Sequence, residues 1–399
     1  MIIRHFIKCE TCGHPHTLRI QVGHEPYQEH TFQCFECEEE IVVGMDCHPA
    51  TASAHIREIQ NCEHGSSEGT IINLSSGFPI PKEDRHRDCV FPSMRHTHAF
   101  SEIHDAMGVG KNAPKFSSFE EMRAWALMQK GVNELWPIVK KGWSLTAKGK
   151  LGFATEIFRQ YRGGQFKESY ELQFVLFDFC GRMLMPIKYH LFEYASDHCS
   201  EIARLHNCEY LKFRQFFKST MANENIERYF ETFSEYFRCF SDFSQTLMHV
   251  KYGMVISDDF EASSHAFSKT KLFYGNAFET LTSNIAVLAC LNNIGDGRRF
   301  DQFVTMDLKK YLTINKANRC NPFKDTLPFQ DICSCLDSTI RNASHHGGMK
   351  LVGNGRTIQY RSGGGGMLRT MSYLSYLNQC NEIMLACCAL LALELVIAF

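Results

Sequence analysis

Two pairs of cysteines near the N-terminus constrain the fold of this chain most strongly. Cys9 and Cys12 form one Cys-x2-Cys pair, and Cys34 and Cys37 form a second. Each pair can place two thiolates on one metal ion from a tight turn, and two such turns complete a tetrahedral four-sulfur site. We therefore predict one structural zinc ion per chain, held in a small N-terminal β zinc ribbon over residues 1–50.

Nearby residues leave further ligand sets open. His14, His16 and the neighbouring Cys47 and His48 are close in sequence, but their spacing is less regular. The alternative interpretation is that the four cysteines are unrelated and bind no common metal ion. Because all four predicted ligands are cysteines, we expect a closed, structural site rather than a catalytic one.

The start of the chain bears on the state of its thiols. Arg4, His5 and Lys8 interrupt the first apolar stretch, so we expect no secretory signal and a cytoplasmic location. Thiols stay reduced in that compartment. The 18 cysteines are therefore expected as metal ligands or small core residues.

The composition is that of a folded chain with more than one core. Of the 399 residues, 44% are hydrophobic and 22% are charged, which excludes a disordered chain. The net charge of −2 hides an asymmetry, since residues 298–399 carry twelve Lys and Arg against seven Asp and Glu. A basic C-terminal part on an acidic body favours a local site for a polyanion.

The chain divides into four predicted parts, and its fold class is mainly α. The ribbon is followed by a linker over 51–115, which is rich in His, Ser, Gly and Pro. A helical middle region over 116–221 begins with a capping box at Ser118-Phe119-Glu120-Glu121. A helical domain then covers 222–399.

The C-terminal domain is expected to hold four long helices, which predict a four-helix bundle. In the first, aromatic residues recur at spacings of three and four from Tyr229 to Phe243, which indicates core packing rather than base stacking. The second is expected from about Glu261 to Asn293. The third precedes Arg341, and the fourth follows Met367.

The end of the last helix is the most apolar part of the chain. The run from Ile383 to Phe399 is slightly short for a membrane span and contains Glu394. A tail anchor is one interpretation, but a buried closing helix is the better one, and we expect no membrane partner.

A second informative segment is Arg341-Asn342-Ala343-Ser344-His345-His346. The helix that leads into it is expected to start at Pro328 and to be capped by Gly347. Asn342 and His346 are then separated by one helical turn, where a hydrogen bond between them could fix the imidazole tautomer.

A basic hairpin is predicted directly after this segment. Met349–Val352 and Arg356–Arg361 flank the turn sequence Gly353-Asn354-Gly355. No acidic residue occurs between Arg341 and Thr370. Such surroundings suit a phosphodiester, and the predicted substrate-binding residues are Lys350, Arg356, Tyr360 and Arg361.

The segment from Arg341 to His346 resembles the R-x4-6-H motif of HEPN ribonucleases, in its R-N-x3-H form. The resemblance covers roughly residues 222–399 and implies a HEPN four-helix bundle with a small β-hairpin insertion. It also implies metal-independent endoribonuclease activity in a homodimer or higher homo-oligomer. Many proteins of this kind act as toxins or effectors in antiviral, anti-phage defence, so an antitoxin or a trigger protein is an expected partner.

The chemistry of RNA cleavage fits these residues. RNA supplies its own nucleophile, the 2′-OH, and His346 can take or donate a proton. The Arg341 guanidinium can stabilise charge on the phosphorane, with Asn342 beside it, and no catalytic metal is expected. His345 is the second candidate for the acid or base.

Two different interpretations of this segment remain open. Arg341 and the histidines could only cap a helix. The HEPN-like bundle and the zinc ribbon could also form a non-catalytic interaction or RNA-sensing protein.

Overall fold

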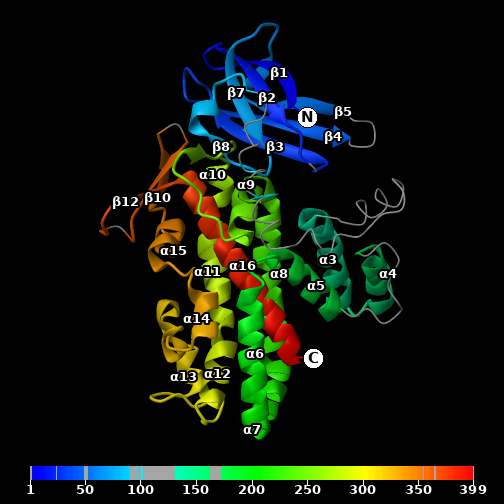
Figure 1. The fold of residues 1–399 in the computed structure, drawn as a ribbon, viewed down its shortest axis with the longest axis vertical. Helices are drawn as coiled ribbons and strands as arrows, with labels where there is room; N and C mark the ends of the chain where they lie inside the picture. The colour runs from blue at the N-terminus through cyan, green and yellow to red at the C-terminus, as the bar shows by residue number, and fades with distance from the viewer. Residues whose placement is uncertain are drawn as a thin grey trace. The chain divides into compact units, whose positions relative to one another are not determined.

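The computed structural model describes residues 2–23, 25–48, 53–89, 96, 100–101, 131–161, 172–353, 355–363 and 365–398. The chain is mainly α-helical with several small sheets, as predicted (Figure 1). Its contacts form two compact units, each assembled from segments that are far apart in sequence. Unit 1 comprises 1–111, 239–275 and 337–381, and unit 2 comprises 112–238, 276–336 and 382–399. The predicted domain limits stay a prediction, and the predicted capping box at 118–121 lies outside the described residues.

Unit 1 begins with two sheets, which form the blue part of the chain in Figure 1. One sheet has the order β6-β1-β2-β7, in which β2 and β7 are parallel, and the other has the antiparallel order β3-β4-β5. The strands are β1 (Ile2–Cys9), β2 (Pro15–Gln21), β3 (Tyr27–Gln33), β4 (Glu40–His48), β5 (Ser53–Gln60), β6 (Cys62–His64) and β7 (Thr70–Ser75).

Apolar side chains from both sheets form one buried core. Leu18 and Ile20 are fully buried in β2, and Ile41 and Val43 are fully buried in β4. These residues alternate along their strands, so each pair points to the same face of its sheet. The same cluster includes Cys9 and Cys34, which places the predicted metal ligands at the edge of a hydrophobic core.

The structure differs from the predicted linker at 51–115, because part of that segment supplies β5, β6 and β7. Strand β7 pairs in parallel with β2, for example Ile72 with Leu18. Pairing between segments more than fifty residues apart leaves no signal in local periodicity, and strand propensity depends strongly on such context.

The rest of unit 1 combines short helices with two further sheets. The predicted hairpin is confirmed: β10 and β11 are antiparallel, with Met349 opposite Tyr360, and β12 adds a third strand. These elements are β8 (Ile80–Pro81), α9 (Phe240–Lys251), β9 (Phe260–Glu261), α10 (Phe267–Thr270), α15 (Ser338–His345), β10 (Met349–Val352), β11 (Thr357–Tyr360) and β12 (Arg369–Ser372).

Unit 2 is helical, and α11 (Phe273–Asn284) and α16 (Tyr373–Ala398) contribute residues to both units. Tyr229, Phe230 and Phe233 are buried, and Trp143 stacks on Phe230 with ring centroids 4.1 Å apart, so the predicted aromatic core packing is confirmed. Its other elements are α3 (Val132–Ala147), α4 (Leu151–Tyr161), α5 (Leu172–Leu184), α6 (His190–Leu205), α7 (Asn207–Phe216), the π-helical turn η4 (Phe217–Met221), α8 (Ala222–Arg238), α12 (Ala286–Gly295), α13 (Leu308–Tyr311) and α14 (Leu327–Cys333).

The single helix predicted from Glu261 to Asn293 is wrong. That stretch contains β9, α10, α11 and most of α12. The backbone N–H of His265 donates to the Thr31 carbonyl (2.8 Å), and the Ser264 hydroxyl accepts from the Thr31 N–H (3.0 Å). These tertiary hydrogen bonds hold the first part of the stretch in a non-helical conformation.

The helix predicted before Arg341 is also divided, into α14 and α15. Pro328 lies in the first turn of α14, as predicted. Asp337 interrupts the pattern because its side chain accepts hydrogen bonds from the backbone N–H groups of Thr339 (2.6 Å) and Ile340 (3.2 Å). An aspartate in this position starts a new helix.

The final helix, α16, is long and apolar enough to cross a membrane by composition, but 89% of its most apolar window is buried inside the structure. Glu394 is buried in this helix and accepts hydrogen bonds from Asn225 (3.1 Å) and from the Tyr229 hydroxyl (2.9 Å). Burial is the main cause that raises the pKa of Glu394, to about 8. The carboxyl group is therefore mostly protonated at neutral pH.

We expect Glu394→Gln to flatten the pH dependence of stability. Between an unfolded-state pKa of about 4.3 and the folded-state value, the folded chain holds a proton that the unfolded chain has released. The stability contributed by Glu394 is thus lost as pH rises through this window. Urea unfolding at about pH 6 and about pH 8 should show a larger decrease for the parent than for the variant. Equal decreases would contradict this assignment.

Candidate functional site

The four predicted metal ligands lie together. Their Sγ atoms are all within 4.8 Å of one another, with Cys9 and Cys37 3.8 Å apart and Cys12 and Cys34 3.6 Å apart. Metal–sulfur bonds of about 2.3 Å in a tetrahedron place the sulfur atoms about 3.8 Å apart. The four thiols can therefore hold one metal ion.

Two similar turns present these thiols. The Gly13 N–H donates to the Cys9 carbonyl (2.9 Å), and the Glu38 N–H donates to the Cys34 carbonyl (3.1 Å). Gly13 has a φ of +77° and Glu38 has a φ of +62°. Both turns thus need a left-handed residue after the second cysteine, which is natural for glycine and costly for glutamate.

The surroundings of Cys34 fit a bound cation. Burial raises the pKa of this thiol to about 12, so its ionisation requires a compensating positive charge. His16 lies with Nε2 3.3 Å from the Cys34 sulfur, where it can donate a hydrogen bond to a thiolate. Two further candidate ligands have partners away from the four sulfurs: His14 bonds the Thr70 hydroxyl (2.8 Å), and Cys47 accepts from Gln28 (3.5 Å).

The Arg341 segment occupies the end of α15. The N–H of Gly348 donates to the Ala343 carbonyl (2.9 Å), and Gly347 has a φ of +66°. This is the Schellman geometry, with Gly347 in the left-handed position, as predicted. The turn fixes the place where His346 leaves the helix.

The Arg341 and Asn342 side chains contact each other. Nη1 of Arg341 donates to Oδ1 of Asn342 (2.8 Å), and Nδ2 of Asn342 donates to the Ser362 hydroxyl (3.2 Å). The Asn342 side chain therefore bonds Arg341 and Ser362 instead of the His346 ring, and its Oδ1 orients the guanidinium.

The two histidines have different surroundings. His346 is exposed, whereas His345 is partly buried against α11. A methyl group added at Gly275 would lie 2.5 Å from the His345 ring, so the imidazole covers this glycine closely. The environment of His346 leaves it accessible to a substrate.

The predicted substrate-binding residues lie on different faces of the hairpin, because side chains alternate along its strands. Lys350 and Arg361 are exposed, while Tyr360 is only 7% exposed because it packs on the same face as Met349. Arg356 is exposed at the other end of the hairpin, and its Nε lies 2.9 Å from Oε2 of Glu261. Sequence reasoning missed Glu261 and its neighbour Arg85, since neither belongs to a local motif.

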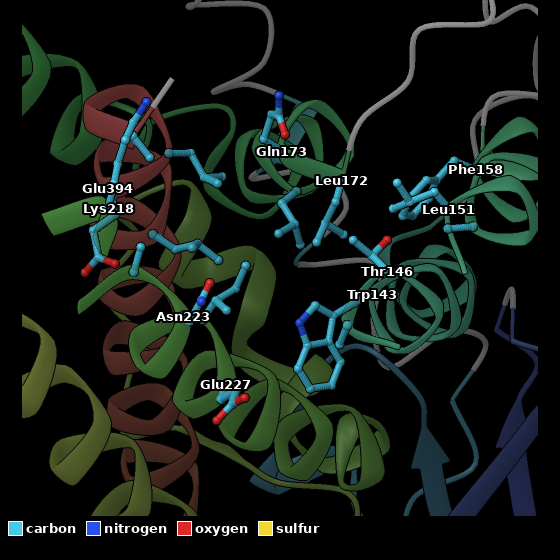
Figure 2. Close-up of a pocket in the computed structure, with 18 of the residues that line it drawn as sticks. Trp143, Thr146, Leu151, Phe158, Leu172, Gln173, Lys218, Asn223, Glu227 and Glu394 are labelled. Atoms are coloured by element: carbon cyan, nitrogen blue, oxygen red, sulfur yellow. The ribbon is translucent and has the colours of Figure 1, made fainter. Parts of the chain in front are cut away.

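A cavity of about 870 Å³ lies in unit 2 and contains none of the predicted site residues. Figure 2 shows Trp143, Leu172 and Asn223 around it, with Glu227 and Glu394 among its polar residues. Its lining is mainly apolar.

The metal site generates a direct prediction. We expect about one metal ion per chain in the purified protein, and its loss in Cys9→Ser and Cys37→Ser with a lower unfolding temperature. Cys208→Ser is the matched control, because Cys208 is exposed on α7. Elemental analysis and thermal unfolding would measure both effects. Cys9→Ser and Cys37→Ser with unchanged metal content and stability would exclude the site.

Comparison with known protein families, curated proteins and solved structures gave no match.

Proposed function

We propose that this protein is a metal-independent endoribonuclease of the HEPN type, with Arg341, Asn342 and His346 as its catalytic residues. The observation that carries the proposal is the hydrogen bond from the Arg341 guanidinium to Asn342 on α15, the helix whose capped C-terminal end carries the exposed His346. The motif predicts the residue types, and the hydrogen bond supports a preorganised cation.

The proposed reaction is attack of the RNA 2′-OH on the adjacent phosphorus. The bond from phosphorus to the 5′-oxygen breaks, leaving a 2′,3′-cyclic phosphate and a new 5′-hydroxyl end. His346 moves the proton of the 2′-OH or of the leaving oxygen, and Arg341 stabilises the charge that builds on the phosphorane. Each role needs only side chains that the segment supplies.

The exposed positive charge near the motif supports an RNA substrate. Lys350 and Arg361 are exposed on the β10–β11 hairpin, and no acidic residue occurs between Arg341 and Thr370. Cations in such surroundings contact phosphates without reading sequence.

The defence role, the oligomeric state and the controlling partner in the proposal follow from the resemblance. The protein acts in the cytoplasm as a toxin or effector of antiviral defence, works as a homodimer or higher homo-oligomer, and is controlled by an antitoxin or a trigger protein. The metal ion in the four-cysteine site is zinc, and its role is structural.

We expect His346→Ala and Arg341→Ala to abolish most RNA cleavage. Loss of a general acid or base typically costs about 10²–10⁴-fold in rate. Loss of a group that stabilises the developing charge costs about 10²–10³-fold. His346 is exposed at the C-cap of α15 and Arg341 is partly exposed within it, so circular dichroism should show that both variants fold. Electrophoresis of cleaved RNA measures the rates.

The control variants address His345. His345→Ala, and Gly275→Ala, which would displace the His345 ring, should cleave RNA more nearly like the parent if His346 is the acid or base. The reverse order would assign that role to His345. Parental cleavage by both His346→Ala and Arg341→Ala would exclude the catalytic assignment. RNA binding without cleavage by the parent would favour a non-catalytic, RNA-sensing protein.

A further inference from the structure

A smaller cavity lined by charged residues lies in unit 1 and contains none of the proposed catalytic residues. It has a volume of about 370 Å³, and five segments that are separate in sequence line it. Its charged residues are Arg85, Glu261 and Arg356. A smaller cavity of about 260 Å³ shares Glu261, His265 and Arg356 with it.

The charged residues are arranged around one carboxylate. Arg85 and Glu261 are almost fully buried, and Arg85 Nε lies 3.6 Å from Glu261 Oε1. Arg85 also donates to the carbonyls of Asn73 and Ser263, at 2.9 Å each. Burial lowers the pKa of Arg85 to about 10, so it stays protonated at neutral pH. The cavity therefore presents two fixed cations and one fixed anion.

Several buried polar atoms at the cavity lack hydrogen bonds. Neither carboxylate oxygen of Glu261 completes one with a described atom, despite the nearby arginines, and the same holds for Oε1 of Gln33. His265, a residue only 6% exposed, lines the same cavity. Burial lowers the pKa of His265 to about 3, so its ring is neutral and offers one donor and one acceptor. Buried polar groups normally find partners, so these atoms point to a ligand.

An exposed aromatic ring forms part of the same cavity. Phe35 is 52% exposed at the tip of the second cysteine turn, between Cys34 and Cys37. The His86 ring meets it edge to face at 5.1 Å, and the His14 ring is stacked at 6.1 Å. The turn that holds the metal thus also holds this ring in place.

We propose that this cavity binds one unpaired guanine base of the RNA. Phe35 stacks on the base, and the Glu261 carboxylate accepts from its N1–H and N2–H groups. Arg356 donates to an acceptor on the base or its phosphate. The inference rests on the proposed function for its substrate class, and it assigns the site a base preference.

The mixture of donors and acceptors favours guanine over simpler ligands. A phosphate or carboxylate alone would be repelled by the Glu261 carboxylate and would leave Oε1 of Gln33 without a partner. A metal cation would be repelled by Arg85 and Arg356. The Watson–Crick edge of adenine presents an acceptor at N1, which would face the Glu261 carboxylate. Guanine combines two adjacent donors with the O6 and N7 acceptors that arginine recognises.

The test is nucleotide binding by the full, zinc-loaded chain. Calorimetry with the 5′-monophosphates of guanosine, inosine and adenosine should rank guanosine first, because inosine lacks the N2 amine. Phe35→Ala should weaken guanosine monophosphate binding by about five- to hundredfold, the usual effect of removing a stacking ring. Phe35→Tyr, which keeps the ring, should bind like the parent. Phe153→Ala is the matched control, since Phe153 is 70% exposed on α4 in the other unit.

Glu261→Gln tests the base edge. It keeps the shape of the side chain but removes one acceptor, so the preference for guanosine over inosine should largely disappear. Should this buried substitution impair folding, Phe35→Ala at the surface still decides the result. Equal binding of guanosine and adenosine monophosphates by the parent, no binding at millimolar nucleotide, or parental affinity in Phe35→Ala would overturn the proposal.

The outcomes separate this site from the catalytic proposal. A parent that cleaves RNA through His346 but does not bind guanosine monophosphate excludes the base pocket alone. A parent that binds and discriminates the nucleotides but does not cleave RNA supports the pocket and excludes the ribonuclease.

Discussion

Unit 1 depends on a short irregular segment, Ala262–His265, that is hydrogen-bonded to both N-terminal sheets. The Ser263 hydroxyl donates to the Ser75 carbonyl (2.6 Å) in one sheet, and the His265 N–H donates to Thr31 (2.8 Å) in the other. The side chain of Gln245 binds the same segment from α9, accepting from the Ser263 N–H (2.7 Å). Buried backbone groups must find partners, so these bonds determine where the segment runs. These hydrogen bonds join segments that are about two hundred positions apart in sequence into one core. They also fix the positions of Glu261 and His265.

Local signals in the sequence predicted the features that local structure determines. The two cysteine turns, the glycine at position 347 and the hairpin around Gly353 each depend on a few adjacent residues, and the structure contains all three. The buried aromatic face of α8 is equally local, since helical periodicity alone defines it.

Features that depend on distant partners could not be predicted in this way. The sequence pattern from Glu261 onward predicts a helix, but hydrogen bonds with β3 and β7 keep the first residues of this stretch out of a helix. The strands between 53 and 75 form because they pair with β1, β2 and β4. Tyr360 is predicted to bind substrate together with the basic residues, but the register of β10 and β11 buries it with Met349. The Arg85–Glu261–Arg356 group has no sequence signal, because its members come from three separate segments.

The proposed roles place RNA on two parts of unit 1, with the β10–β11 hairpin contributing to both. Lys350 and Arg361 belong to the phosphate-binding side, and Arg356 belongs to the base pocket. The central claim is that the 2′-OH of the substrate is the nucleophile. Its most direct test is cleavage of a synthetic RNA in which the nucleotide before the cut carries 2′-deoxyribose. The account predicts that this single change stops cleavage at that position while the unmodified RNA is cut without added divalent cations. Cleavage that continues at the deoxyribose, or that requires added magnesium, would contradict it.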